Sequence, residues 1–283
     1  MNRSTDRLMR DIKAVEELDS VKEGLYYVYE EDDITKGYGL ILGLPDTPYE
    51  HGFYLVSFQF PDTYPYSPPL CKHLAFCDRR QSPNFHDNGT ICLTRLNTWE
   101  SVRDGYADKW TPIMNILSVL RMIQTQVLTA DPLNNEPPYD YKETRPLEHS
   151  NYTEVVRYCN FRYNIIDIYY KLHHNMTILS PYLSQTLCRI VKKHLKLNGL
   201  KILESALVMV NKMPVPVYVT CMVYNNSRTC VMYDSIYSQL LTLIRDCGCY
   251  IPPHILTPPP KEKIPIRLKT LKVEDLQLCN DRS

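Results

Sequence analysis

The chain has 283 residues, of which 32 are basic and 32 are acidic, so its formal net charge is zero. This balance gives no electrostatic reason to expect a nucleic acid or an anionic membrane as a partner. The sequence also contains no uninterrupted run of about 18 apolar residues, and we therefore expect no membrane span. A chain of this length can bury one sizeable core and a smaller second module.

The ten cysteines do not follow the spacing of a disulfide-stapled or zinc-binding protein. Their intervals are irregular, and the chain is too long for a small domain held together by disulfides. Cys247 and Cys249 are one residue too close for the usual zinc-binding pair, and no second pair accompanies them. The polar N-terminal residues lack the apolar segment of a signal peptide. We expect reduced thiols in a cytoplasmic or nuclear protein.

The N-terminal segment predicts an amphipathic helix. Ser4 or Thr5 can cap it, and apolar residues follow with a helical period: Leu8, Ile12, Val15 and Leu18. Its outer face is expected to carry four charged residues, Arg7, Arg10, Asp11 and Lys13.

The next segment predicts antiparallel strands. Short runs rich in tyrosine and valine occupy residues 25–29, 37–42 and 53–60, and turn signals lie near the connections, at Pro45-Asp46 and His51-Gly52. This pattern indicates a β-meander.

The most informative residue follows this meander. Cys92 comes three residues after Asn88-Gly89, a dipeptide that tolerates positive φ and so favours a sharp turn. Pro83 stiffens the loop that carries Asn84. A cysteine on a rigid turn beside an amide is typical of a nucleophile whose acyl product needs an oxyanion donor. An inert core cysteine is the alternative.

A helix is predicted beyond this site, with Thr111 as its cap and Pro112 at its first position. Its buried stripe is expected to contain Ile113, Ile116, Leu117, Leu120, Ile123, Val127 and Leu128.

The second half of the chain reads as mainly helical. Apolar periodicity predicts one helix around residues 155–170, a second around 183–195 that ends at Asn198-Gly199, a third over 200–210 and a fourth around 236–244. Residues 216–224 have extended character. From Ile251 onward, repeated prolines predict an extended or disordered tail.

Several motifs occur in an order that resembles the ubiquitin-conjugating enzymes over about residues 5–140. They are the Pro-rich turn at Pro45, the loop Tyr64-Pro65-Tyr66-Ser67-Pro68-Pro69, the loop Ser82-Pro83-Asn84, Cys92, and Trp110-Thr111-Pro112. A long segment between Cys92 and Trp110 and the triplet Asn135-Glu136-Pro137 resemble the subgroup of large conjugating enzymes.

This resemblance implies an α/β (α+β) fold: a conjugating core with a four-stranded antiparallel meander and flanking helices, followed by a mainly helical C-terminal extension. We expect the catalytic core at residues 1–147, the extension at 148–250 and a Pro-rich tail at 251–283. The extension is expected to select the activating enzyme or the modifier and to contribute no chemistry.

The resemblance also implies a reaction. Ubiquitin, or a ubiquitin-like modifier, would pass from an activating enzyme to Cys92 as a thioester and then to a substrate lysine. Asn84 would donate to the oxyanion or hold the loop, and Glu136 would orient or deprotonate the lysine. No cofactor or metal is expected, because ATP is consumed by the upstream activating enzyme. His86 is interpreted as an exposed loop residue instead of a general base.

Further expectations concern neighbouring residues and partners. Ser82 stands where most of the family has histidine, which puts the rigidity of that loop in doubt. Trp99 and Trp110 are interpreted as packing residues. Tyr66, Pro112 and Ile113 match the family surface that docks a RING-type ligase. A non-catalytic modifier-binding or scaffold protein remains the alternative, whereas a cysteine protease would need a His and Asn/Asp pairing that the sequence does not show.

Overall fold

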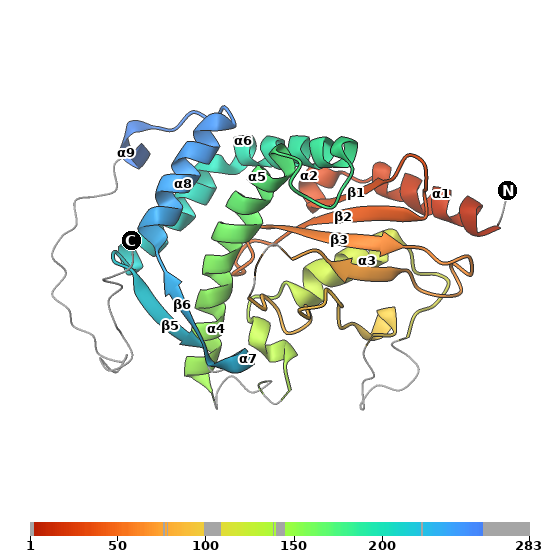
Figure 1. Ribbon diagram of the computed structural model, residues 1–283, viewed down its shortest axis with the longest axis horizontal. Coiled ribbons are helices and arrows are strands. Elements are labelled where there is room, and N and C mark those ends of the chain that lie inside the picture. Colours follow the sequence, from red (N-terminus) through yellow and green to blue (C-terminus); the bar gives the residue numbers. More distant parts are fainter. Residues whose placement is uncertain are drawn as a thin grey trace.

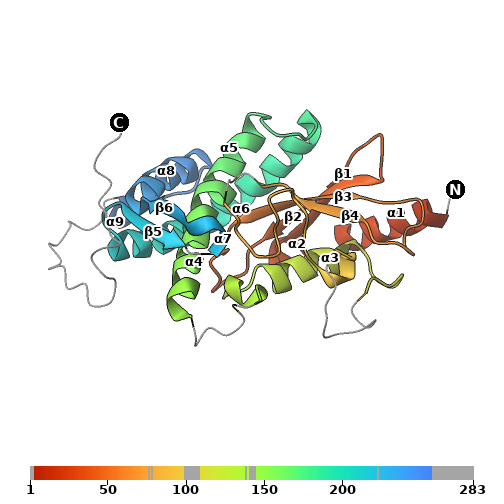
Figure 2. The same ribbon diagram turned by 60° about the horizontal axis from the view of Figure 1, so that its bottom comes forward.

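The computed structural model describes residues 3–75, 77, 79–98, 109–137, 139, 145–221 and 223–256. Figures 1 and 2 show an elongated molecule. A sheet with its covering helices occupies one end, a second group of helices with a β-hairpin occupies the other, and a long helical rod runs between them (Figures 1 and 2). The α/β class predicted from the sequence is confirmed.

The first sheet is the expected four-stranded meander. Its strands are β1 (Leu25–Tyr29), β2 (Lys36–Leu42), β3 (Phe53–Gln59) and β4 (Leu70–His73), all antiparallel and in chain order. The register pairs Leu40 of β2 with Leu55 of β3, and both side chains are buried. Three strands agree with the sequence pattern to within one residue at each end, and β4 was expected from the resemblance alone.

Helix α1 (Arg3–Glu16) buries Leu8, Ile12 and Val15 as predicted, and the short helix α2 (Ser20–Glu23) follows it. The placement of Asp11 on the outer face was wrong. Only 6% of Asp11 is exposed, since its carboxylate accepts hydrogen bonds from Arg7 Nε at 2.9 Å and from the Tyr64 hydroxyl at 2.5 Å. A charged residue can be buried when it is paired in this way.

Helix α3 (Ile116–Met122) starts later than predicted and continues into a π-helical turn, η3 (Ile123–Val127). Asn115 caps it, because the Asn115 side chain accepts from the Ser118 backbone N–H and Ser118 Oγ accepts from the Asn115 backbone N–H. The turn before this cap leaves Ile113 88% exposed, so Ile113 does not belong to the buried stripe. Leu120 packs beside Gly39, where β2 has no side chain to displace it.

The rod that joins the two ends consists of three contiguous helical segments. They are α4 (Pro146–Cys159), the π-helical η6 (Asn160–Asp167) and α5 (Ile168–His173). Asn160 Nδ2 donates to the Glu50 carbonyl at 2.9 Å, and Asn160 Oδ1 accepts from the Tyr54 hydroxyl at 2.7 Å. The rod is therefore hydrogen-bonded through its buried side to β3 and to the loop before it.

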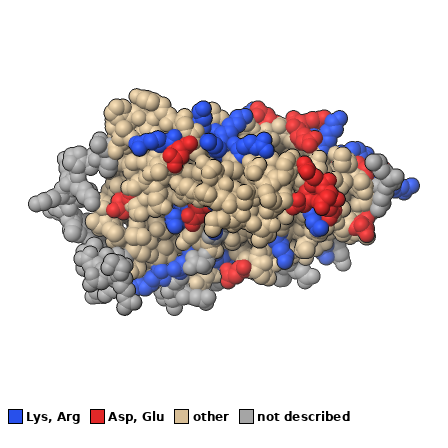
Figure 3. All heavy atoms as spheres, turned by 45° about the horizontal axis from the view of Figure 1, so that its top comes forward, with Lys and Arg blue, Asp and Glu red and all other residues tan. Residues whose placement is uncertain are grey.

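Helix α6 (Pro181–Lys212) passes straight through Asn198-Gly199, so the predicted helix end there was wrong. Gly199 is instead a packing residue: a Cβ there would lie 2.5 Å from Ile244 of helix α8 (Tyr233–Asp246). Exposed basic residues lie along α6, at Arg189, Lys192, Lys193, Lys196 and Lys201. Figure 3, turned so that the top of Figure 1 comes forward, shows Lys and Arg side chains gathered on that face.

A β-hairpin follows α6 and precedes α8 in the chain. Strands β5 (Val217–Cys221) and β6 (Ser227–Val231) pair antiparallel, and the short helix α7 (Val223–Asn226) connects them. The extended character of β5 was predicted, whereas β6 was not. The first residues of the predicted tail are also ordered differently: α9 (Pro253–Leu256) forms there, and Ile251 and Ile255 are buried. Trp99 and the rest of the tail lie outside the described residues.

No helix in the described ranges is long and apolar enough to cross a membrane. The same ranges contain no group of three or more metal-ligating side chains. The domain boundaries at residues 147 and 250 stay predictions.

Candidate active site

Cys92 lies where the turn predicted from Asn88-Gly89 returns the chain to the core. Gly89 has φ 83°, and the Asn88 side chain accepts from the Thr90 N–H at 2.9 Å, which closes the turn. The Cys92 backbone N–H donates to the Asn84 carbonyl at 2.8 Å. Cys92 is 9% exposed and opens into a cavity of about 470 Å³. That cavity is lined in part by Arg80, Asn84, His86, Asn135 and Glu136.

The Asn84 side chain shapes the loop around the thiol. Its Nδ2 donates to the Cys92 carbonyl at 2.8 Å, and its Oδ1 accepts from Asn135 Nδ2 at 3.0 Å. Asn135 Nδ2 also donates to the Gln126 carbonyl at 2.7 Å. An amide NH₂ carries two donor hydrogens. One of them holds the loop through the Cys92 carbonyl.

Ser82 performs a bracing role despite its short side chain. It is fully buried, its Oγ accepts from the Asn84 N–H at 3.2 Å, and it reaches the Val127 carbonyl at 3.5 Å. The loop is therefore connected to η3 at a position where most of the resembled family has histidine.

His86 does not lie free on the surface, so the interpretation as an exposed loop residue was wrong. Its Nε2 is 2.8 Å from Cys92 Sγ, and its backbone N–H donates to the Thr90 carbonyl at 3.0 Å. Phe85 pairs with Ile91 across the same turn, which brings the two arms side by side. The spacing of His86 and Cys92 about Asn88-Gly89 was the signal that could have predicted this contact.

The electrostatics favour a neutral Cys92 and His86 pair at rest. Burial raises the pKa of the Cys92 thiol, Arg80 opposes this shift and Glu136 adds to it. Burial and Arg80 lower the pKa of His86, and Glu136 and Asp87 oppose them. The thiol can therefore donate to a neutral imidazole, which is ready to accept its proton during attack.

Glu136 faces the same cavity from the end of η4 (Pro132–Asn135). Its Oε2 accepts from the Tyr224 hydroxyl at 2.6 Å, and Tyr224 belongs to α7 of the extension. The Arg80 guanidinium carbon lies 4.4 Å from the Tyr224 ring centroid. No local signal in the sequence pointed to Tyr224, which the fold brings from the extension to Glu136. The expectation that the extension contributes no chemistry stays a prediction.

A family model described as ubiquitin-conjugating enzyme matches residues 7–160, more than half of the chain. The chain belongs to the ubiquitin-conjugating enzyme family, as its motifs predicted. The match spans the cavity and Cys92.

Named relatives extend this finding. The chain is 36% identical over 164 residues to ubiquitin-conjugating enzyme E2 Z of Danio rerio, a match that covers 57% of this chain and 47% of that protein. The E2 Z of Homo sapiens is 36% identical over 164 residues and is covered to 44%. The human dual E2 ubiquitin-conjugating enzyme/E3 ubiquitin-protein ligase BIRC6 is 37% identical over 110 residues, which are 38% of this chain and 2% of that protein. The match thus spans less than half the length of these two E2 Z proteins.

Among solved structures, an E2 domain of a Toxoplasma gondii ubiquitin-conjugating enzyme has a TM-score of 0.44 and 24% identity. The match covers 57% of this chain and 99% of that one.

Proposed function

We propose that this protein is a ubiquitin-conjugating transferase that carries ubiquitin, or a ubiquitin-like modifier, as a thioester on Cys92. The observation that carries this proposal is the arrangement around one thiol: Cys92 lies 2.8 Å from His86 Nε2, its carbonyl is held by Asn84, and both open into a cavity shared with Glu136. A nucleophile beside a base and an amide donor is the arrangement that acyl transfer requires.

The first step is transthiolation. The Cys92 thiol passes its proton to His86 as sulfur attacks the carbonyl of the modifier's thioester on the activating enzyme. The old carbon–sulfur bond breaks, the activating enzyme's thiolate leaves and takes up a proton, and the modifier stays on Cys92. A thiolate suits this role because it is both a good nucleophile and a good leaving group.

The second step is aminolysis. The amine of a substrate lysine attacks the thioester carbonyl. The Asn84 amide, whose Nδ2 already donates one hydrogen to the Cys92 carbonyl, uses its second N–H to stabilise the oxyanion. Collapse expels the Cys92 thiolate and leaves an isopeptide bond. Glu136 accepts the proton that the lysine loses or orients the amine. ATP is used upstream by the activating enzyme, so this chemistry requires no cofactor or metal at Cys92.

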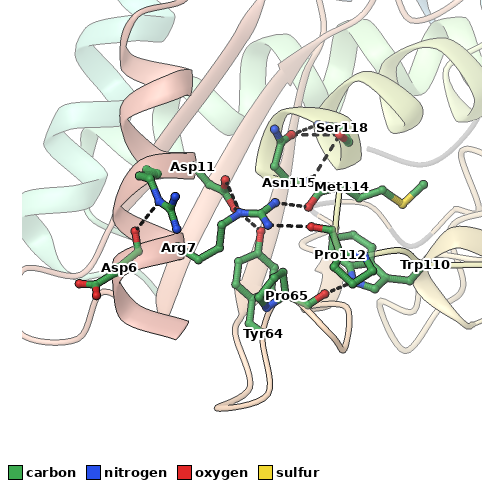
Figure 4. Close-up of polar contacts among 11 residues, drawn as sticks. Asp6, Arg7, Asp11, Tyr64, Pro65, Trp110, Pro112, Met114, Asn115 and Ser118 are labelled. Carbon is green, nitrogen blue, oxygen red and sulfur yellow. Dashed lines mark hydrogen bonds and ion pairs between the residues drawn. The ribbon is translucent and has the colours of Figure 1, made fainter. Parts of the chain in front are cut away.

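A ligase docking surface is proposed beside α1, where Figure 4 shows a network of polar contacts between this helix and two loops. Arg7 donates to the carbonyls of Pro112 at 2.7 Å and Met114 at 2.8 Å (Figure 4). Trp110 Nε1 donates to the Pro65 carbonyl at 2.7 Å (Figure 4), and 8% of Trp110 is exposed, as expected of a packing residue.

This network holds two loops in place, and their outward side chains have no apolar cover. Tyr66 is 80% exposed and Ile113 is 88% exposed, and the adjacent Pro112 is exposed too. Rigid apolar residues that protrude into solvent favour a protein partner. We assign the surface formed by Tyr66, Pro112 and Ile113 to a RING-type ligase.

The cytoplasm or the nucleus remains the proposed location, because the cysteine spacing favours reduced thiols.

One gel assay tests the function. The protein is incubated with activating enzyme, ATP and ubiquitin, and the products are separated with and without reductant. We expect a higher band that disappears on reduction. A non-covalent modifier-binding or scaffold protein would bind ubiquitin and give no such band. Repeating the assay with a panel of modifiers and activating enzymes identifies the pair that this protein uses.

A further inference from the structure

The Tyr224 hydroxyl and the Glu136 carboxylate form the contact that joins the extension to the site. Their oxygen atoms are 2.6 Å apart although the residues are 88 positions apart in the chain. This length is in the range of a charge-assisted O–H···O⁻ hydrogen bond. Burial and the bond to Glu136 raise the pKa of Tyr224, so the phenol stays protonated and acts as the donor.

Arg80 lies over the aromatic ring of Tyr224. Its guanidinium carbon lies 4.4 Å from the Tyr224 ring centroid, within the range of a cation–π interaction. Arg80 also donates to the Pro83 carbonyl at 2.6 Å, and its buried Nε has no hydrogen-bond partner in the described part of the chain. The aromatic face of Tyr224 therefore compensates for the hydrogen bond that the Arg80 guanidinium lacks. The charge of this guanidinium partly offsets the rise that burial causes in the pKa of Cys92.

The hairpin that carries Tyr224 is itself fixed to the rod. The Tyr152 ring of α4 lies 5.7 Å from the Tyr224 ring, and the Tyr152 hydroxyl donates to the Arg80 carbonyl at 2.8 Å. Asn151 Nδ2 donates to the Thr220 carbonyl at 3.0 Å. Tyr224 has φ 56°, a left-handed conformation that is unfavourable for a non-glycine residue and persists where the surroundings hold it.

We infer that Tyr224 is a positioning residue of the conjugation site: its hydroxyl orients the Glu136 carboxylate toward the incoming lysine, and its ring holds Arg80 beside Cys92. This inference rests on the proposed function. Glutamate has one more rotatable bond than the aspartate that most of the resembled family has at this position. A free Glu136 would populate several rotamers, and the hydrogen bond from Tyr224 selects one of them.

Tyr224→Phe separates these two roles, because phenylalanine keeps the ring under Arg80 and removes the donor to Glu136. We expect charging of Cys92 to stay at the wild-type rate. Discharge of the Cys92 thioester to free lysine should become roughly tenfold slower, since one hydrogen bond to a charged group is lost. Discharge to hydroxylamine should not change, because this small amine is largely unprotonated at neutral pH and needs no carboxylate.

Three further variants make the result specific. Glu136→Gln should slow lysine discharge, and adding Tyr224→Phe to it should produce little further loss, because both changes affect one interaction. Tyr250→Phe alters a tyrosine of the same extension that is 77% exposed and should match the wild type. A thermal melt of each variant confirms that it is folded.

Wild-type lysine discharge by Tyr224→Phe would overturn the inference. So would equal slowing with lysine and hydroxylamine, or a full additional loss in the double variant. Failure of the wild-type protein to form any thioester would instead refute the proposed function, and the two failures are therefore distinguishable.

Discussion

Nδ1 of His51 lies 3.2 Å from Nε2 of His194, and this contact connects the β2–β3 loop of the conjugating core to α6 of the extension. The rings also approach each other, with centroids 5.4 Å apart, and the His194 ring meets Phe53 edge-on. Burial lowers the pKa of each histidine to about 4, with Lys201 adding to the shift at His51 and His51 adding to it at His194. Glu50, 3.7 Å from His51, does not offset these effects.

This pair predicts acid sensitivity. A histidine in the unfolded chain has a pKa of about 6.5. Below that pH the unfolded state therefore binds protons, whereas the two histidines of the folded protein stay neutral. The contribution of this pair to the free energy of unfolding is therefore fully present above about pH 6.5, and it is lost as the pH falls toward 4. Urea unfolding over this range should show a midpoint that decreases with pH, and His194→Gln should show a smaller decrease. His73, whose pKa burial lowers to about 3, contributes with the same sign in both proteins. An identical decrease in the variant would contradict the assignment.

Cys92 is predicted to be the residue that carries the modifier. Cys92→Ser should form a conjugate that survives reductant, because an ester is cleaved less readily than a thioester, and Cys92→Ala should form none. Gel electrophoresis of charging reactions with and without reductant measures both. Cys71, buried in β4, provides the matched control: Cys71→Ala should still be charged. Normal charging of Cys92→Ala would refute the assignment of the nucleophile.

Asn84→Ala should slow isopeptide formation more than it slows charging. Loss of one oxyanion donor costs about 2.7–4 kcal/mol in transition-state stabilisation, and aminolysis has the less reactive nucleophile. Single-turnover rates of charging and of lysine discharge measure the two steps separately. Equal losses in both would show that the hydrogen bond from Asn84 to the Cys92 carbonyl, and hence the loop shape, is the main contribution.

His86→Ala should slow charging most strongly near neutral pH. A neutral imidazole 2.8 Å from the thiol accepts its proton during attack, and burial keeps that thiol protonated. A positioned base contributes typically ~100-fold or more, and the deficit should shrink at high pH, where the thiolate forms without help. Charging rates as a function of pH measure this. His254→Ala, at an exposed histidine of α9, is the control, and parallel pH profiles for His86→Ala and wild type would contradict the role.

Ile113→Ala should leave charging unchanged and abolish stimulation of lysine discharge by a cognate RING-type ligase. Ile113 is 88% exposed, so its truncation should change the free energy of unfolding by less than about 0.5 kcal/mol. The measurement is discharge with and without the ligase. Ile178→Ala, at an 80% exposed isoleucine of the extension, should remain stimulated. Full stimulation of Ile113→Ala would place the ligase elsewhere.

Features that depend on neighbours in the chain were predictable from the sequence. The strands followed from short runs rich in tyrosine and valine that are bounded by turn signals, and the turn before Cys92 followed from Asn88-Gly89. Both signals reside in a few consecutive residues. The helix start near Thr111 failed for a related reason: Thr111-Pro112 is an acceptable local signal, but Asn115 and Ser118 form the better cap.

Features that depend on contacts between distant segments were not predictable. Asp11 reads as a surface charge until Tyr64 is placed against it, and Gly199 reads as a helix end until α8 packs there. Tyr224 is the clearest case in the site. It is one of 22 tyrosines, and only the folded hairpin brings it to Glu136.

The uninterrupted rod formed by α4, η6 and α5 acts as a splint. The family match ends at residue 160, inside this rod, so the conserved fold and the extension meet along hydrogen-bonded helix instead of at a hinge. Each residue of a helix advances the chain by about 1.5 Å and turns it by about 100°. A single inserted residue before Asn160 would therefore swing the whole extension about the rod axis and carry Tyr224 away from Glu136. The number of residues in one helix thus sets how the two halves of the protein are aligned beside Cys92.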